Sequence, residues 1–457
     1  MTSSTISGRK LAELVLNRVE GRAAYLNLAL PEIFHEHPEA EQRERAFCTE
    51  LTYGVYRHLY QIDYFLGRLL SRPFDSLKTP VKNVMRIALY QLIYLTDIPA
   101  RAVCFSAVAQ VKNSQYQGLA PLVNGVLRAY LRNKDKLKPP DRSLDLVESL
   151  AIEYSHPRWL VERWLKRFGE ERTEQILQVN NEEPPLTLRF NQYQGLINHV
   201  LDDFDQAGIK YTMGLILPEA IQIKSLSGPL DKLASFQSGK LFVQDESSML
   251  VAHLVDPQPG ETIVDLCAAP GGKSTHLAEL MGDQGKIWSI DDHPHKIDLI
   301  VQNAKRLKLQ NICPYLADAR NFKIPGGGFA DAVLVDAPCT GTGVLRRRVD
   351  ARYRRQPEDI ETLVAIQREI LRNASRLVRP GGRLIYSTCT LEPEEDQEQI
   401  QWFLSKHPDF ETVDFGKFLP EMHVRYLDDP WEKWLTILPI SGGGDGFFMC
   451  RMERKKA

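Results

Sequence analysis

The sequence predicts a multidomain chain: an all-α helical bundle, a small α+β module, and an α/β domain with a mostly parallel sheet. Apolar residues recur at helical spacing over about the first 130 positions. From about Gly239 onward, short β-rich runs alternate with helical segments, which is typical of a parallel sheet with helices on both faces. The length of 457 residues also exceeds that of one ordinary domain.

The first part is expected to be helical because its apolar residues fall on single helix faces and strand alternation is scarce. The residues on these faces are Leu11, Leu14, Val15 and Val19, and later Leu119, Leu122, Val123, Val126, Leu127 and Leu131. A polar stretch at 133–145 with adjacent Pro139 and Pro140 reads as a linker. Short strand-like runs (LTLRF, IQIKS, KLFVQD) follow. We therefore predict segments at 1–138, 139–238 and 239–457.

Composition indicates a globular protein of the cytoplasm. The net charge is −2, but positions 1–140 hold 19 basic and 12 acidic residues, a net charge of +7 that suits a polyanionic partner. No apolar stretch is long enough to span a membrane. Seven cysteines without a CxxC pair indicate reduced thiols. His293 and His295 are close in sequence, but we expect no metal site and no membrane association.

A loop rich in small residues follows the first strand expected in the α/β part, in the letters VDLCAAPGGKSTHL at 264–277. Small residues let the backbone approach a ligand, and the helix that follows favours an anionic group such as a phosphate or an amino-acid carboxylate. A P-loop would need a glycine at Cys267, and the GxGxxG fingerprint of dinucleotide sites is absent. The loop therefore predicts a site for a nucleotide-like ligand.

Acidic residues end the next two expected strands. Asp291 lies 26 residues beyond Asp265, where a carboxylate can accept hydrogen bonds from ribose hydroxyls, and Asp292 beside it is the competing choice. Asp318 ends the third strand and is placed to reach an adenine amino group, although such a residue is also a common N-cap or turn residue.

Two cysteines follow two further buried strands, Cys339 in VLVDAPCTGTG and Cys389 in LIYSTCTLEPEE. Ligands of open α/β sheets bind outside the carboxyl ends of the strands, so both thiols and Asp336 are expected in one crevice. A thiolate is a strong nucleophile and a nearby carboxylic acid can donate a proton. This set suits covalent attack on an electron-poor ring.

These motifs together resemble the S-adenosylmethionine-dependent RNA 5-methylcytosine methyltransferases of the RsmB (Sun/Fmu) type. The resemblance covers about residues 240–454 in the family's order: CAAPGGK, Asp291, Asp318, DAPCTGTG, YSTCT and DGFFMC. The helical start, with RAFCTELTYGVYRH, IPARAVCFSAV and LVNGVLRAYLR, is similar to the NusB-like RNA-binding domain of the bacterial branch. The resemblance implies a Rossmann-like class I methyltransferase with a seven-stranded, mostly parallel sheet.

The resemblance also assigns roles. Asp291 would hold the ribose of S-adenosylmethionine and Asp318 its adenine. Cys389 would be the nucleophile, and Cys339 would assist product release. The methionine end of the cofactor would be lined by Cys267, Ala268, Ala269, Pro270, Gly271, Gly272 and Lys273, with Asp336 also on the cofactor side. Thr390 stands where serine is common in the family, and Lys296 where arginine is frequent.

Chemistry explains why these residue types are needed. Carbon-5 of cytosine is a poor nucleophile until a thiolate adds to carbon-6, and Asp336 is placed to favour that addition through the ring nitrogen N3. The target base must be splayed out of any helix. The implied substrate is a cytosine in bacterial small-subunit (16S) ribosomal RNA. Transfer RNA, another ribosomal site, or an inactive NusB-like RNA-binding factor remain alternatives, although the intact Cys339, Cys389 and Asp336 argue against inactivity.

Six arginines and one acidic residue occupy positions 346–355, just after the first cysteine motif. The planar guanidinium group suits phosphate contacts, so we predict that Arg346, Arg347 and Arg348 bind RNA. A solvated helix start is the alternative, and burial is the alternative to base stacking for Tyr353. No obligate protein partner is evident.

Overall fold

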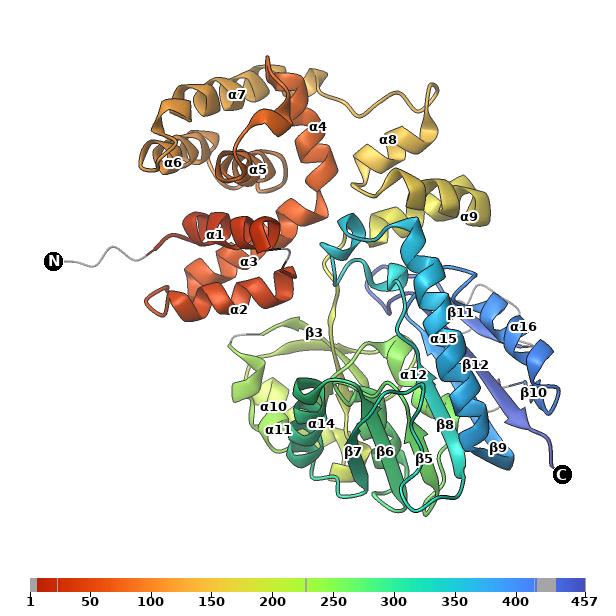
Figure 1. The fold of residues 1–457 in the computed structure, drawn as a ribbon. Coiled ribbons are helices and arrows are strands. Elements are labelled where there is room, and N and C mark those ends of the chain that lie inside the picture. The colour runs from red at the N-terminus through yellow and green to blue at the C-terminus, as the bar shows by residue number, and fades with distance from the viewer. Residues whose placement is uncertain (1–5, 23, 227, 415, 417–432, 457) are drawn as a thin grey trace. The chain divides into compact units, whose positions relative to one another are not determined.

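A computed structural model describes residues 6–456 of the chain apart from 23, 227, 415 and 417–432 (Figure 1). The chain folds into two compact units. The first comprises Met1–Asn181 and Leu345–Arg354, and the second comprises Glu182–Val344 and Arg355–Ala457. These units do not coincide with the sequence segments expected at 1–138, 139–238 and 239–457, and that division stays a prediction.

The first unit is helical, as its apolar spacing predicts. Leu11, Val15 and Val19 are buried one turn apart on the first helix, and Leu131 lies in a helix as its spacing predicts, although it is 38% exposed. None of the described helices combines the length and the apolar character that a bilayer span requires. The helices are α1 Gly8–Arg22, α2 Leu26–Glu36, α3 Gln42–Arg57, α4 Leu59–Leu69, α5 Thr79–Tyr94, α6 Ala100–Lys112, α7 Ala120–Asn133, α8 Leu146–Glu153 and α9 Arg158–Val179.

The segment Leu345–Arg354 completes the first unit although it is distant in sequence. Val349 is buried in the same apolar core as the helices. An Asp350 carboxylate oxygen accepts a hydrogen bond from the Leu26 backbone N–H at 3.0 Å, at the start of α2. The Tyr353 hydroxyl donates to the Tyr56 carbonyl oxygen at 2.8 Å. The unit is therefore built from two separate stretches of chain.

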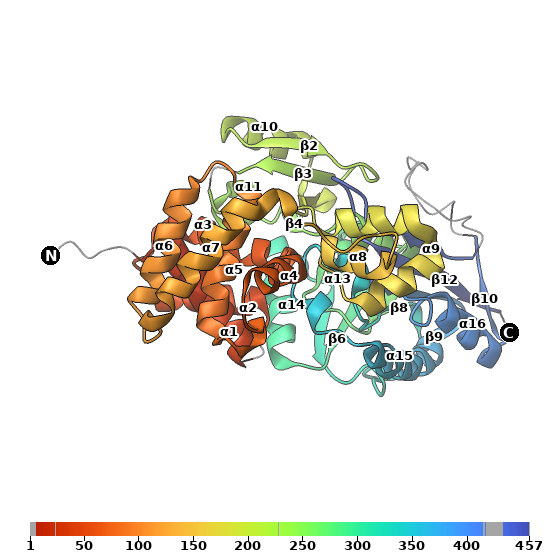
Figure 2. The same ribbon diagram turned by 90° about the horizontal axis from the view of Figure 1, so that it is seen from above.

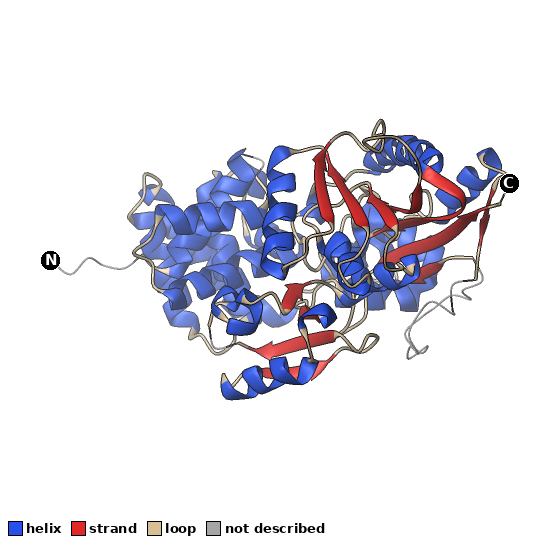
Figure 3. Cartoon of the chain, turned by 90° about the horizontal axis from the view of Figure 1, so that it is seen from below, coloured by secondary structure: helices blue, strands red, loops and turns tan. Residues whose placement is uncertain are grey.

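A small antiparallel sheet opens the second unit and matches the strand-like runs of the sequence (Figures 2 and 3). Leu188, Phe190 and Ile221 of this sheet pack against Val200 and Phe204 of one helix. The strands lie in the order β2-β3-β1-β4. Their bounds are β1 Leu186–Phe190, β2 Lys210–Met213, β3 Ala220–Ser225 and β4 Leu241–Val243, and the helices are α10 Ile197–Gln206 and α11 Ala234–Gln237.

The main sheet of the second unit confirms the predicted α/β class, but it has eight strands where seven were expected. Its strands lie in the order β10-β12-β9-β8-β5-β6-β7, and β11 pairs with β12 as an eighth strand. The pairs among β5, β6, β7, β8 and β9 are parallel. The strands are β5 Thr262–Asp265, β6 Lys286–Asp291, β7 Ile312–Leu316, β8 Ala330–Asp336, β9 Val378–Thr388, β10 Phe410–Thr412, β11 Leu435–Ile437 and β12 Phe447–Arg454.

The C-terminal hairpin predicted from WLTILPI and GGGDGFFMCRMER is present, since Leu435 of β11 lies opposite Met449 of β12 in an antiparallel pair. It lies at the sheet edge, as expected, because β11 pairs with the side of β12 that faces away from β9. β12 lies between β9 and β10, because the short strand β10 pairs with its outer side. The three residues of β10 carry too little alternation to be recognised as a strand.

Helices cover both faces of the main sheet (Figure 1). One face packs against Leu250, Leu277 and Ile300 of three helices, and the other against Leu371 and Phe403 of two helices. These helices are α12 Glu246–Val255, α13 Gly272–Leu280, α14 Pro294–Leu307, α15 Pro357–Leu377 and α16 Gln397–Lys406. The strand order reverses at β5, which has β6 on one side and β8 on the other, so a ligand site is expected at the carboxyl ends of these strands.

Candidate active site

The two thiols singled out in the sequence lie together. Cys339 follows β8 and Cys389 follows β9, and their Sγ atoms are 3.5 Å apart. The strands place them because Asp336 lies opposite Ser387 in the parallel pair of β8 and β9, so the two loops leave the sheet side by side. Neither cysteine forms a disulfide, and both are half-buried.

Asp336 at the end of β8 lies between the thiol loops and the loop after β5. One of its carboxylate oxygens accepts a hydrogen bond from the Ser387 hydroxyl at 2.9 Å. The other accepts from the Lys273 Nζ at 2.7 Å. The Lys273 ammonium also lies 5.1 Å from the ring centre of Phe447. The Asp336 side chain is 29% exposed and is therefore accessible to a ligand.

The surroundings distinguish the cysteines chemically. The hydrogen bond with the Cys389 thiol and then burial raise the pKa of Cys339 well above the usual value, and the charge of Glu395 acts in the same direction. Burial, followed by the charge of Asp265, raises the pKa of Cys267. Because the thiolate is the reactive form, these protonated thiols are poor nucleophiles.

The loop after β5 is shaped for a small ligand. Gly271 has φ +101°, a backbone conformation that favours glycine, and caps α13 without a side-chain hydrogen bond. A Cβ on Gly272 would lie 3.2 Å from Phe242, so a side chain there would crowd the helix start. The first N–H groups of a helix have no partner within that helix and attract an anionic group. The carboxylate of an amino-acid moiety fits this position.

The predicted ribose and adenine residues lie at the ends of β6 and β7. Asp291 is buried, and one of its oxygens accepts from the Ala269 backbone N–H at 3.2 Å, which ties it to the ligand loop. Lys296 lies 2.9 Å from its other oxygen. The competing Asp292 is exposed and pairs with His293 at 2.7 Å. Asp318 is 37% exposed and pairs with Arg320 at 2.6 Å.

Asp265 is a residue that the sequence reasoning used only as a reference point. One of its oxygens accepts from the Ser274 hydroxyl at 2.6 Å, and the other is buried without a hydrogen-bond partner among the described residues. Burial raises its pKa to about 7. Its place at the end of β5 is the signal that could have identified it, by the reasoning applied to Asp291.

S-adenosylmethionine fits this set of residues. Its amino-acid carboxylate suits the start of α13 and Lys273, and its ribose diol suits the carboxylate of Asp291. The unpartnered oxygen of Asp265 is an acceptor available to a cationic ligand. Acidic side chains at the ends of four neighbouring strands or their loops also suit a ligand that carries a positive sulfonium group.

The predicted arginine contacts are only partly accessible. Arg346 is 1% exposed, so its expected contact with RNA phosphates is contradicted by burial of the side chain. Arg347 is half-buried and Arg348 is exposed. Tyr353 is half-buried, and its hydroxyl is bonded to backbone oxygens. This agrees with the alternative that Tyr353 is buried in the protein and does not stack on a base.

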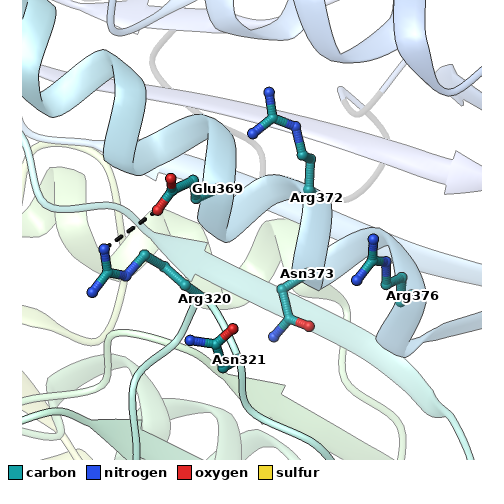
Figure 4. Close-up of a pocket in the computed structure, with 6 residues that line it drawn as sticks. All are labelled: Arg320, Asn321, Glu369, Arg372, Asn373 and Arg376. Carbon is teal, nitrogen blue, oxygen red and sulfur yellow. Dashed lines mark hydrogen bonds and ion pairs between the residues drawn. The ribbon is translucent and has the colours of Figure 1, made fainter.

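A second, basic pocket of about 400 Å³ lies along α15 (Figure 4). Arg372 and Arg376 are exposed on one side of the helix, and neither forms an ion pair with a described residue. Arg320 on the facing loop pairs with Glu369 at 3.3 Å. None of the predicted catalytic residues lines it. Its lining is Arg320, Asn321, Glu369, Arg372, Asn373 and Arg376.

A buried group of Glu219, His253 and His276 also has the composition of a metal site. His253 Nε2 lies 2.5 Å from a Glu219 oxygen, and His276 Nε2 lies 3.6 Å from the same oxygen. Burial is the main cause that lowers the pKa of His276, and the charge of Arg189 is the second. A positive group so close also disfavours a bound cation. A hydrogen bond between His253 and Glu219 accounts for their contact, and we assign no metal to this group.

The switch-point loop, its helix and the acidic strand ends define the class of S-adenosylmethionine-dependent methyltransferases. Residues 252–453 match the family described as 16S rRNA methyltransferase RsmB/F. Residues 7–132 match the NusB family, and residues 156–227 match the ferredoxin-like domain of RsmF/B-like methyltransferases.

Proteins similar to this chain span its full length. The probable ribosomal RNA small subunit methyltransferase B of Bacillus subtilis (strain 168) is 40% identical over 98% of this chain and 99% of the relative. Its counterpart in Cronobacter sakazakii is 32% identical over 99% of both. The crystal structure of PH0851 has a TM-score of 0.80 and 28% identity, over 98% of this chain and 99% of that one. The chain belongs to the 16S rRNA methyltransferase RsmB/F family, and it is an RNA methyltransferase that uses S-adenosylmethionine.

Proposed function

We propose that this enzyme methylates carbon-5 of a cytosine in small-subunit ribosomal RNA, with Cys389 as the nucleophile. The observation that carries the proposal is the pair of Sγ atoms 3.5 Å apart at the ends of β8 and β9, beside Asp336. A lone thiol would suffice for attack on the ring. A second thiol in contact with the first suits an enzyme that must also release a covalently bound product.

The residues divide the work as follows. Cys389 adds through sulfur to carbon-6 of the cytosine, and Asp336 in its carboxylic acid form favours the addition by donating a hydrogen bond to N3. When bound, S-adenosylmethionine supplies an electrophilic methyl group to the activated carbon-5. Removal of the carbon-5 proton by a base restores the ring and expels the Cys389 sulfur. Cys339, whose pKa is raised, is placed to assist this release as a protonated thiol.

RNA binding is proposed for two basic surfaces. Arg347 and Arg348 lie on a unit whose sequence carries a net positive charge over positions 1–140. The pocket along α15 presents Arg372 and Arg376, which suit a phosphodiester backbone (Figure 4). The rRNA names of the bacterial relatives support both the substrate and a location in the cytoplasm.

Two variants test the roles of the thiols. With labelled S-adenosylmethionine and small-subunit ribosomal RNA, Cys389→Ala is expected to lose methyl transfer while cofactor binding, followed by calorimetry, is retained. Cys339→Ala is expected to accumulate a protein–RNA adduct that persists in a denaturing gel. Cys313→Ala, which alters a cysteine outside the pair, is the matched control. Turnover by Cys389→Ala would remove that residue from the nucleophile's role.

The position of the mark tests the substrate. Bisulfite sequencing of ribosomal and transfer RNA from cells that lack the enzyme should show one cytosine of 16S RNA that has lost protection. Loss of protection in transfer RNA instead would favour the alternative substrate.

A further inference from the structure

The side chain of Glu395 joins the two loops that carry the thiols. We propose that Glu395 is a positioning residue that holds the Cys339 loop against the Cys389 loop, and that its carboxylate is needed for release of the methylated product. This inference rests on the proposed roles of Cys389 and Cys339. Glu395 is fully buried, so it acts through other residues and does not touch the substrate.

Glu395 binds the Cys339 loop at two points directly and at a third through Gln367. Its Oε1 accepts from the Thr340 backbone N–H at 2.9 Å, directly after Cys339 in the chain. Its Oε2 accepts from the Thr340 hydroxyl. Gln367 of α15 donates to Glu395 Oε1 at 3.0 Å and to the Pro338 carbonyl oxygen at 2.9 Å. Residues on both sides of Cys339 are thereby fixed to one carboxylate.

The same carboxylate binds the Cys389 loop. Its Oε2 accepts from the Thr390 hydroxyl at 3.0 Å, directly after Cys389. The Thr340 and Thr390 hydroxyls are themselves 2.8 Å apart. The Gly343 backbone N–H donates to the Cys389 carbonyl oxygen at 3.0 Å and adds a direct link between the loops. Glu395 is therefore one hydrogen bond away from the residue that follows each thiol.

Burial raises the pKa of Glu395, and the hydrogen bonds that it accepts from Thr340, Thr390 and Gln367 act in the opposite direction. The side chain accepts at every one of these contacts, as an ionised carboxylate does, and forms no ion pair with a described residue. Its charge acts on Cys339, because it contributes to raising the pKa of that thiol. Loss of the charge at position 395 would therefore alter the protonation of Cys339, and loss of the whole side chain would also alter the spacing of the loops.

Two substitutions separate these effects. Glu395→Ala removes both, and misplacing the thiols is expected to lower kcat roughly 100-fold. Binding of S-adenosylmethionine and the KM for RNA should stay within about twofold, since neither is held by Glu395. The adduct of Cys389 with RNA should accumulate in a denaturing gel, because attack continues while release slows.

Glu395→Gln keeps the shape and removes the charge. It is expected to restore part of the turnover and to move the pH limb that reports Cys339 to lower pH, because a negative neighbour has been lost. Glu398→Gln changes an exposed glutamate three residues away and is the matched control. Thr340→Val, which removes one hydroxyl donor, should reproduce a milder release defect if Glu395→Ala fails to fold.

Normal turnover in Glu395→Ala, or slow turnover of all these variants without adduct and without a shifted pH profile, would overturn the inference. A Cys389→Ala enzyme assayed in parallel separates the role of Cys389 as nucleophile from the role of Glu395. If that variant still transfers methyl groups, the proposed function fails first. If it is inactive while the Glu395 variants turn over normally, only the role of Glu395 fails.

Discussion

At the scale of single residues, Arg189 shows how the small antiparallel sheet acts on the cofactor loop. It is fully buried on β1 and donates to both oxygens of Glu279 at 3.0 and 2.7 Å. It also donates to the Gly272 carbonyl oxygen at 2.8 Å and to the Thr275 hydroxyl at 3.0 Å, both in the first turn of α13. One side chain thereby fixes the start of the helix that faces the cofactor.

Arg189→Lys is expected to weaken cofactor binding. A lysine cannot reproduce the planar fork and leaves buried acceptors unpaired, at a cost of about 2 kcal/mol. If about 1.4 kcal/mol of this cost is lost from the free energy of cofactor binding, the Kd of S-adenosylmethionine rises about tenfold. Calorimetric titration measures it. Arg454→Lys, which alters a partly exposed pair with Asp409, is the control, and equal Kd values for both variants would contradict the prediction.

Residue-level reasoning from the sequence reached the side chains at strand ends. Asp291, Asp336, Cys339 and Cys389 were recognisable because the carboxyl ends of parallel strands share one edge of a sheet. Glu395 was not, because its partners lie on a loop 55 residues earlier in the chain and on a helix, and no local pattern encodes such a contact. Arg346 was misjudged because a run of arginines looks alike in sequence whether solvent or protein surrounds it.

At the scale of elements, α4 begins beside a histidine that makes the first unit sensitive to acid. His58 stacks on Tyr94 with ring centroids 3.9 Å apart, and its enclosed Nδ1 has no hydrogen-bond partner among the described residues. Burial lowers its pKa from 6.5 to about 3. Below pH 6.5 the unfolded chain therefore binds a proton that the native chain does not bind. The contribution of His58 to the free energy of unfolding is complete above pH 6.5 and falls as the pH drops toward 3.

The expected loss from His58 at pH 5 is up to about 2 kcal/mol. Urea unfolding of the full chain at pH 7.5 and pH 5 measures it. His58→Phe keeps the stacking and should reduce the pH dependence by that amount, whereas His35→Gln on an exposed face of α2 should leave it unchanged. An unaltered pH dependence in His58→Phe would mean that other groups cause the acid sensitivity.

Elements were predictable where burial imposes a period. The parallel strands and the helical start followed from apolar runs and from residues one helical turn apart. The strand β10 was missed, because a strand of three residues carries too little pattern to be assigned.

At the scale of the whole molecule, binding to ribosomal RNA should depend strongly on salt. Each phosphate contact contributes a slope of about 0.9 in a plot of log K against log salt concentration, with some variation between single and double strands. Arg347→Ala with Arg348→Ala is expected to lower the slope by up to about 2. Arg379→Ala, which removes an arginine already paired with Asp331, is the control.

The same titration locates the RNA. Arg372→Ala with Arg376→Ala tests the pocket along α15 in the same way. If neither double variant changes the slope, the RNA backbone contacts neither of these two surfaces. The sequence indicated a polyanionic partner through the charge of positions 1–140, but it could not show which arginines reach the surface, since that depends on packing between distant segments.

The ten residues Leu345–Arg354 have a practical consequence for anyone who dissects this enzyme. An N-terminal fragment cut at the proline-containing linker would lack the side chain of Val349 and the Asp350 cap on α2, so it would expose part of its interior and tend to aggregate. Chimeras between relatives face the same obstacle. Exchange of the RNA-binding half requires that this internal decapeptide travel with it.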